Sequence, residues 1–84
     1  MKRIRLTFHS RLQCELRGAT EAEVRQAIEQ GSRELAKSGR ILCRFSFPFD
    51  RKWQGVSYAV KQVAPVIKEE PGEIVVITVY TFYF

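Results

Sequence analysis

The stretch Glu73-Ile-Val-Val-Ile-Thr-Val-Tyr-Thr-Phe-Tyr-Phe84 decides the fold, because it is one continuous β-branched and aromatic run. Side chains alternate between two faces along a strand, and here both alternating sets are largely apolar. A strand of this kind is typical of the interior of a sheet that is covered on both faces. The run therefore predicts a central strand.

Two further strands are expected before this run. Ile41 to Phe49 alternates with a period of two, Asp50 to Gly55 is a polar turn, and the alternation resumes from Val56. Pro65 predicts a bulge or an edge position in that second strand. The segment 70–73 reads Glu-Pro-Gly-Glu, with proline and glycine in the central positions of a type II turn. We therefore expect the last two strands to pair antiparallel.

The N-terminal part of the chain predicts one strand and a first helix. Lys2 to Phe8 alternates apolar and basic residues, which indicates a half-buried strand with a basic outer face. A short helix is expected from Ser10 to Arg17, because Ser10 and Gln13 have the spacing of a capping box. Gly18 is expected to end this helix.

A second helix is predicted from Thr20. The threonine hydroxyl can accept the Glu23 amide while the Glu23 carboxylate reaches back, which is the pattern of a capping box. Gly31 supplies the C-terminal cap, and the residues 32–39 are expected to be a polar connection.

These elements predict an α+β fold in one domain, residues 1–84, with the order β-α-α-β-β-β. We expect an antiparallel sheet, made of a three-strand C-terminal meander and the N-terminal strand, packed on the helical pair. The position of the N-terminal strand in the sheet stays open. The residues expected in the core are Val24, Ile28, Phe45, Ile77 and Val79.

The charge of the chain favours an anionic partner. The net charge is +5, and nine of the fourteen cationic residues are arginine, whose planar fork matches a phosphate group. Nucleic acid is the first candidate and an acidic protein the second. The alternative is that the charge serves solubility alone.

The sequence gives no sign of a disulfide, a signal peptide, a metal or cofactor site, or a membrane span. Cys14 and Cys43 lie outside any C-x-x-C spacing, and no signal-peptide pattern follows the N-terminal Met-Lys-Arg, so we expect a cytoplasmic protein with unbridged, buried thiols. One histidine and two distant cysteines form no recognisable metal site, and no cofactor motif is present. No segment approaches the roughly 18 apolar residues of a membrane span.

One run of the sequence resembles a known pattern. The segment 9–24, HSRLQCELRGATEAEV, together with Ile-Thr-Val-Tyr at 77–80, is similar to a family of small proteins described only as a domain of unknown function. Members of that family read T-x-H-A-x-x-R-M-x-x-R-G-I-S-x-x-E-V and end in a strand with T-x-Y. The matching residues are Thr7, His9, Arg17, Gly18, Glu23, Val24, Thr78 and Tyr80. Gln13, Cys14 and Ala19 depart from the pattern, and Gln13 replaces an arginine.

That family is distantly similar to small bacterial ribonuclease toxins of the RelE and BrnT type, which belong to toxin–antitoxin pairs. The resemblance implies cleavage of RNA by attack of its own 2′-hydroxyl, which requires a base, an acid and cations at the phosphate. It implies a catalytic set of His9, Arg17 and Tyr80. Arg3, Arg5 and Arg11 would bind phosphate, and we expect them to converge with Arg17 on one surface around His9.

Each of these residues also has a structural alternative. His9 can fix the strand-to-helix junction, Arg17 can complement the helix dipole, and Tyr80 can belong to the core. The segment Arg51-Lys52-Trp53 can stack a nucleic-acid base or contact an acidic partner, or its tryptophan can fold back on the sheet.

Two functions follow from the sequence, and whether the chain is an enzyme stays open. The first is an RNA-binding module or a toxin-like ribonuclease. The alternative is a non-catalytic module for protein interaction or assembly, either as a homodimer or with an acidic protein partner.

Overall fold

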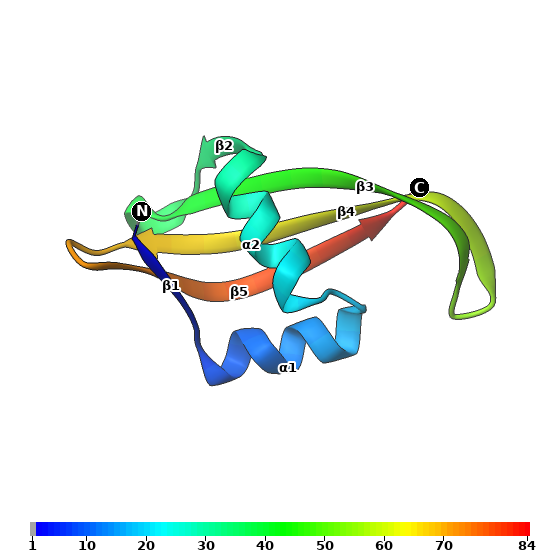
Figure 1. Cartoon of the computed structure of the whole chain (residues 1–84), viewed down its shortest axis with the longest axis horizontal. Helices are drawn as coiled ribbons and strands as arrows, with labels where there is room; N and C mark the ends of the chain where they lie inside the picture. The colour runs from blue at the N-terminus through cyan, green and yellow to red at the C-terminus, as the bar shows by residue number, and fades with distance from the viewer. Residues whose placement is uncertain (1) are drawn as a thin grey trace.

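Strands take up most of the C-terminal half of the chain, where β-branched and aromatic residues alternate. The computed structural model describes residues 2–84 and has an α+β fold (Figure 1). Its elements are β1 (Arg3–Leu6), α1 (Phe8–Arg17), α2 (Glu21–Gln30), β2 (Ser32–Leu35), the 3₁₀ turn η1 (Lys37–Gly39), β3 (Ile41–Trp53), β4 (Val56–Glu69) and β5 (Glu73–Tyr83).

The five strands form one sheet in the order β1-β5-β4-β3-β2. The strands β2 to β5 pair antiparallel, as expected for a meander, but β1 runs parallel to β5, with Arg3 beside Glu73 and Leu6 beside Val76. The prediction of a purely antiparallel sheet is therefore wrong. A helix rather than a tight turn follows β1, so no hairpin fixes the direction of this strand.

The strand β2 lies in the segment that the sequence predicts to be a polar connection. All four of its residues are exposed, and it pairs with the first part of β3 at the edge of the sheet. An edge strand of this length gains its stability from backbone hydrogen bonds, so it needs no apolar alternation. This is why the periodicity of side chains gave no signal for it.

The hairpin between β3 and β4 is longer than expected. The strand β3 continues to Trp53, and the turn consists of Gln54 and Gly55, whose φ angles of 51° and 84° fit a two-residue hairpin loop. Asp50 has a φ of 46° and lies where the β3–β4 register shifts. The polar residues 50–53 therefore form a bulged strand instead of the predicted turn.

Pro65 lies inside the sheet. It is buried in β4 and is paired with Val79 of β5, so the alternative of an edge position is wrong. The register between β4 and β5 does shift next to this position, because Val66 pairs with Thr78 and Ile67 pairs with Val76. The extra residue is Ile77 of β5, so the bulge lies in the partner strand and the alternative of a bulge in β4 is also wrong. At the next hairpin Gly72 has no φ in the left-handed range, which a type II turn requires, so that turn type was also wrongly predicted.

Both helices are capped by threonine. Thr7 caps α1 by accepting the Ser10 amide at 3.1 Å, and its hydroxyl donates to the Val76 carbonyl of β5 at 2.9 Å. The helix thus begins before the predicted Ser10. Thr20 and Glu23 form the expected capping box of α2, with bonds of 3.1 and 2.9 Å.

The hydrophobic core lies between α2 and one face of the sheet. Val24 and Ile28 of α2 are buried, as is Val79 of β5, which confirms three of the five expected core residues. Phe45 is only half buried. Ile77 is also half buried and lies on the opposite face of the sheet, because side chains alternate along β5 and its neighbour Val76 belongs to the core.

A buried lysine connects the corner between α1 and α2 to the sheet. The Lys61 ammonium on β4 donates to the Gly18 carbonyl at 2.8 Å and lies 2.8 Å from the Glu23 carboxylate. Two further bonds reach the same corner, because the hydroxyls of Thr81 and Tyr83 both donate to the Arg17 carbonyl. The corner is therefore fixed by three side chains from two strands.

Replacing Ile67 by alanine should lower the free energy of unfolding by about 2–5 kcal/mol, because its side chain is fully buried under α2. Replacing Ile77, the isoleucine of the half-buried opposite face, should cost clearly less. Urea denaturation of the two variants measures both values, and equal losses would contradict the assignment of the faces.

Lys61→Met should lower the free energy of unfolding by about 3 kcal/mol, because it leaves the Glu23 carboxylate without its buried partner. A second change, Glu23→Gln, should recover part of this loss by removing the unpaired charge. Lys68→Met is the matched control on the same strand, since Lys68 is exposed, and it should change stability by less than about 0.5 kcal/mol. A control that costs as much as Lys61→Met would argue against a clamp at Lys61.

Candidate functional site

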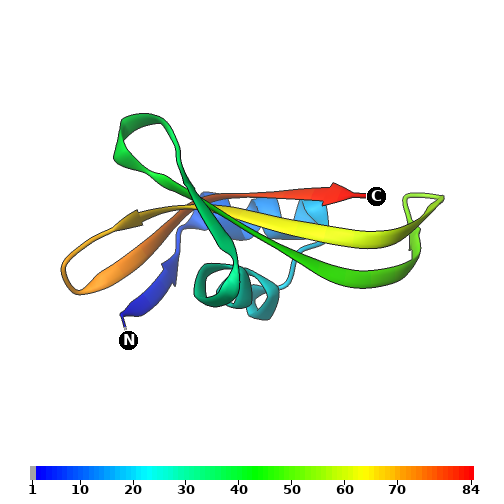
Figure 2. The ribbon, with the colours of Figure 1, turned by 90° about the horizontal axis from the view of Figure 1, so that it is seen from above.

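The two faces of the sheet are covered differently. Figure 2 shows α2 on one side of the sheet and, on the other side, only the hairpin from β2 to β3 curling over one end. We call this second side the open face. Alternate residues of the three long strands point to this side, namely Leu42, Arg44 and Ser46 of β3, Gln62, Ala64 and Val66 of β4, and Tyr80 and Phe82 of β5. Ala64 is buried beneath its neighbours there.

Two aromatic rings and two arginines form a row across the open face. The rings of Tyr80 and Phe82 lie nearly parallel with centroids 6.4 Å apart. The Arg17 guanidinium lies over Tyr80 at 5.1 Å, and that of Arg44 lies over Phe82 at 5.6 Å. The two aromatic residues remain 43% and 39% exposed. We call these four residues the aromatic–arginine row.

Hydrogen bonds hold both arginines of the row in place. Arg17 donates to the Val79 carbonyl at 2.7 Å, so the end of α1 is tied to β5. Arg44 donates to the Gln62 side chain at 3.1 Å and to the Glu34 carboxylate of β2 at 3.2 Å. These contacts fix the guanidinium planes before any ligand arrives, which lowers the entropy cost of binding.

Next to Tyr80 the open face has a hollow of about 310 Å³. Its floor is apolar, and the hairpin that curls over the face in Figure 2 contributes two cations to its rim, Lys37 and Arg40. No acidic residue lines it. The lining residues are Ala36, Lys37, Arg40, Leu42, Val66, Ile77, Thr78 and Tyr80.

The three residues of the expected catalytic set lie along the seam between α1 and β5. The His9 Nε2 atom lies 3.4 Å from the Thr78 hydroxyl, and Arg17 stacks on Tyr80. His9 and Arg17 are eight positions apart on one helix, which separates them by about 12 Å along its axis. The structure thus brings Arg17 and Tyr80 together and places His9 at the other end of the seam.

The remaining arginines of the first half do not share one surface. Arg5 pairs with Glu73 at 3.1 Å, at the β1 edge of the open face, and Arg3 lies on the same side of that strand. Arg11 instead pairs with Glu21 of α2 at 3.1 Å, on the covered side. The predicted convergence of Arg3, Arg5, Arg11 and Arg17 around His9 is therefore wrong.

In the expected binding segment at residues 51–53, the tryptophan side chain is folded back on the protein. The Trp53 ring is stacked on Tyr83 with centroids 5.2 Å apart, and it is packed against Gly18 in the corner between the helices. The Arg51 guanidinium lies over the Phe49 ring at 4.6 Å. The structural alternative for Trp53 is thus confirmed, and only Arg51 and Lys52 are exposed.

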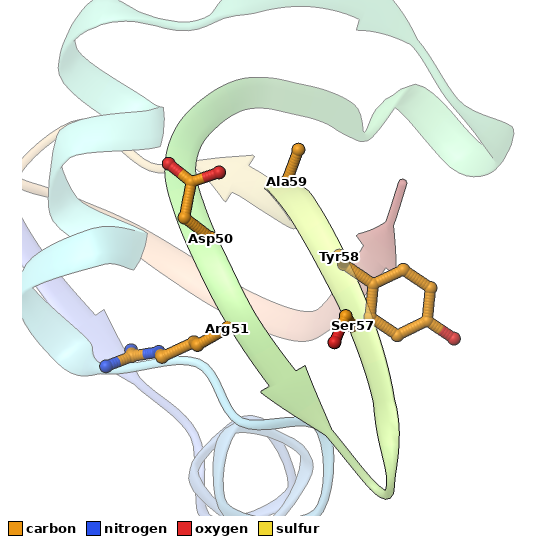
Figure 3. A pocket seen from close by; sticks show the side chains of 5 residues that line it. All are labelled: Asp50, Arg51, Ser57, Tyr58 and Ala59. Carbon is orange, nitrogen blue, oxygen red and sulfur yellow. The ribbon is translucent and has the colours of Figure 1, made fainter.

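A second hollow of about 320 Å³ lies beside the bulge of the β3–β4 hairpin (Figure 3). It is lined by Asp50, Arg51, Ser57, Tyr58 and Ala59. In Figure 3 the Arg51 side chain and the Tyr58 ring point away from each other. The polar groups do not converge on a common point, so this hollow is not a site.

The cysteines do not supply a reactive group. Both are free and buried, and burial raises the pKa of the Cys14 thiol and of the Cys43 thiol above the ordinary value. The thiolate is the nucleophile, so both side chains are unreactive near neutral pH. Among residues 2–84, no group of three or more histidine, cysteine, aspartate and glutamate side chains is placed to hold a metal ion.

We expect both thiols to resist alkylation in the folded protein and to react fully after denaturation, because unfolding removes the burial that keeps them protonated. Mass spectrometry after timed treatment with an alkylating agent measures this. Rapid modification of Cys43 in the native state would contradict its complete burial.

The open face contains residues that the sequence analysis missed. Phe82, Arg44, Lys37 and Arg40 were not singled out, although the aromatic pair at positions 80 and 82 shares one strand face. That spacing was the available signal, and it was overlooked because the whole run was expected to be covered on both sides.

Comparisons of the chain with protein-family models, with curated proteins and with solved structures find no match. None of the helices within residues 2–84 has the length and apolar character needed to cross a membrane.

Proposed function

We propose that this protein binds single-stranded RNA on the open face of its sheet. The aromatic–arginine row is the observation that carries the proposal. Unpaired bases stack on exposed aromatic rings and on guanidinium planes, and the row offers both in one line. A duplex keeps its bases stacked on one another, so the row favours a single strand.

The cations around the row support the same ligand. Lys37 and Arg40 border the hollow next to Tyr80, at one end of the row. An RNA strand whose bases stack on Tyr80 and Phe82 would bring its phosphates close to Lys37 and Arg40. Glu34 is the acidic residue in contact with the row, and Arg44 neutralises it. An anionic ligand therefore meets a face with an excess of positive charge.

The proposal covers binding and not cleavage. General acid–base cleavage needs a base and an acid at one phosphate. His9 is in contact with Thr78, whereas Arg17 and Tyr80 are stacked together further along the seam. The backbone positions of His9 and Arg17 lie about 12 Å apart along α1, and their partners Thr78 and Tyr80 are two residues apart on β5. A toxin-like ribonuclease would need His9 and Tyr80 to reach the same phosphate.

Alanine substitution of Tyr80 or Phe82 should weaken RNA binding by about 1–3 kcal/mol each, because each removes one stacking surface for a base. Fluorescence anisotropy with labelled single-stranded RNA and DNA of matched sequence measures the affinity. Phe49→Ala removes a ring from the covered side and is the matched aromatic control. It should leave the affinity of the folded protein unchanged.

The double variant Lys37→Ala/Arg40→Ala should flatten the dependence of the binding constant on salt. Each lost phosphate contact removes about 0.7 from the log–log slope for a single strand. Arg51→Ala is the matched control, since Arg51 is a sequence candidate that lies away from the open face. A wild-type protein that binds no single strand at low salt would overturn the proposal, and a stable complex with an acidic protein through the same residues would replace it.

A further inference from the structure

The helix α1 carries an apolar ridge on its outer side. Phe8, Leu12 and Leu16 follow one another at a spacing of four residues, and they are 79%, 42% and 69% exposed. The buried residues of this helix, Ser10 and Cys14, lie on its opposite side, toward β5. The ridge therefore points away from the rest of the protein.

We propose that the ridge is an interface with a second copy of this chain, in which two α1 helices pack antiparallel. The spacing is symmetric about Leu12, so a two-fold axis at this residue would place Leu12 against its own copy. Phe8 would then pack against Leu16 of the partner subunit, and the reverse contact follows from the symmetry. This proposal rests on α1 alone and does not depend on RNA binding.

The charges beside the ridge suit a symmetric pair. One flank carries Arg11 and Glu15, and the other carries His9 and Gln13. In the antiparallel arrangement each flank meets its own copy, so Arg11 lies near both Arg11 and Glu15 of the partner subunit. Arg11 is also paired with Glu21 of its own subunit at 3.1 Å, which offsets the like charge at the axis. Neither flank brings together an excess of like charge, which a homodimer has to avoid.

The size of the ridge sets the strength of the dimer. A helix of ten residues is about 15 Å long, so the contact falls below the roughly 1,200 Å² of a stable complex. The dimer is therefore weak, and its population depends on concentration.

The two-fold symmetry also determines the directions in which the open faces of the two subunits point. A two-fold axis between antiparallel helices is perpendicular to both of them, so it leaves the direction of each flank unchanged. The flank with His9 borders the open face through Thr78. Both open faces of the dimer thus look the same way and form one surface with two aromatic–arginine rows.

Cysteine cross-linking tests the axis directly. In a Leu12→Cys variant the new thiols of two subunits meet at the axis, so mild oxidation should yield a covalent dimer. Leu35→Cys is the matched control, because Leu35 is 88% exposed on β2 and lies far from α1. Cross-linking of Leu12→Cys that is no faster than that of the control would overturn the proposal.

Sedimentation velocity over a range of concentrations tests the wild-type protein. We expect a monomer–dimer equilibrium that Leu12→Glu abolishes and Leu35→Glu leaves unchanged, with circular dichroism confirming that both variants are folded. A wild type that stays monomeric at every concentration would overturn the interface and leave RNA binding untouched. A wild type that dimerises but binds no single-stranded RNA at low salt would overturn the proposed function and leave the interface untouched.

Discussion

The arrangement of the helices on the sheet depends on one constraint, which is the attachment of the corner between α1 and α2 to β4 and β5. The Arg17 carbonyl accepts two hydroxyl donors from β5, and the Gly18 carbonyl accepts the buried Lys61 ammonium of β4. Gly18 has a φ of 77°, and a side chain there would collide with Trp53 and Tyr83, so only glycine fits. Because this corner is fixed, α1 must run along β5 while α2 crosses the sheet.

The same attachment explains why one face stays open. The strand β1 pairs with β5 only as far as Val76, and α1 covers the remaining edge of β5 through Thr7, His9 and Arg17. Because α1 lies along the edge of β5, it does not cover the second face of the sheet. Most residues of the pattern that resembles the family of unknown function lie on this seam or at the corner, where their contacts connect α1 to the sheet.

The sequence predicted local features well and long-range ones poorly. The capping box of Thr20 and Glu23 follows from contacts between near neighbours, so it could be predicted. The parallel direction of β1 depends on a partner some 70 residues away. The exposure of Tyr80 could not be predicted either, because alternation shows that two faces are apolar and not which of them a helix covers.

The positive charge of the chain is not spread evenly. Arg5, Arg11, Arg25, Arg33 and Arg44 each form an ion pair with a glutamate. Within residues 2–84 no such pair is found for six cations, namely Arg3, Arg17, Lys37, Arg40, Arg51 and Lys52. Arg17, Lys37 and Arg40 border the open face, whereas Arg51 and Lys52 lie on the hairpin between β3 and β4. Three of the six unpaired cations therefore lie beside exposed aromatic rings, where they are available to a ligand. Solubility alone would be served by charge anywhere on the surface, so this placement favours recognition of an anion on the open face.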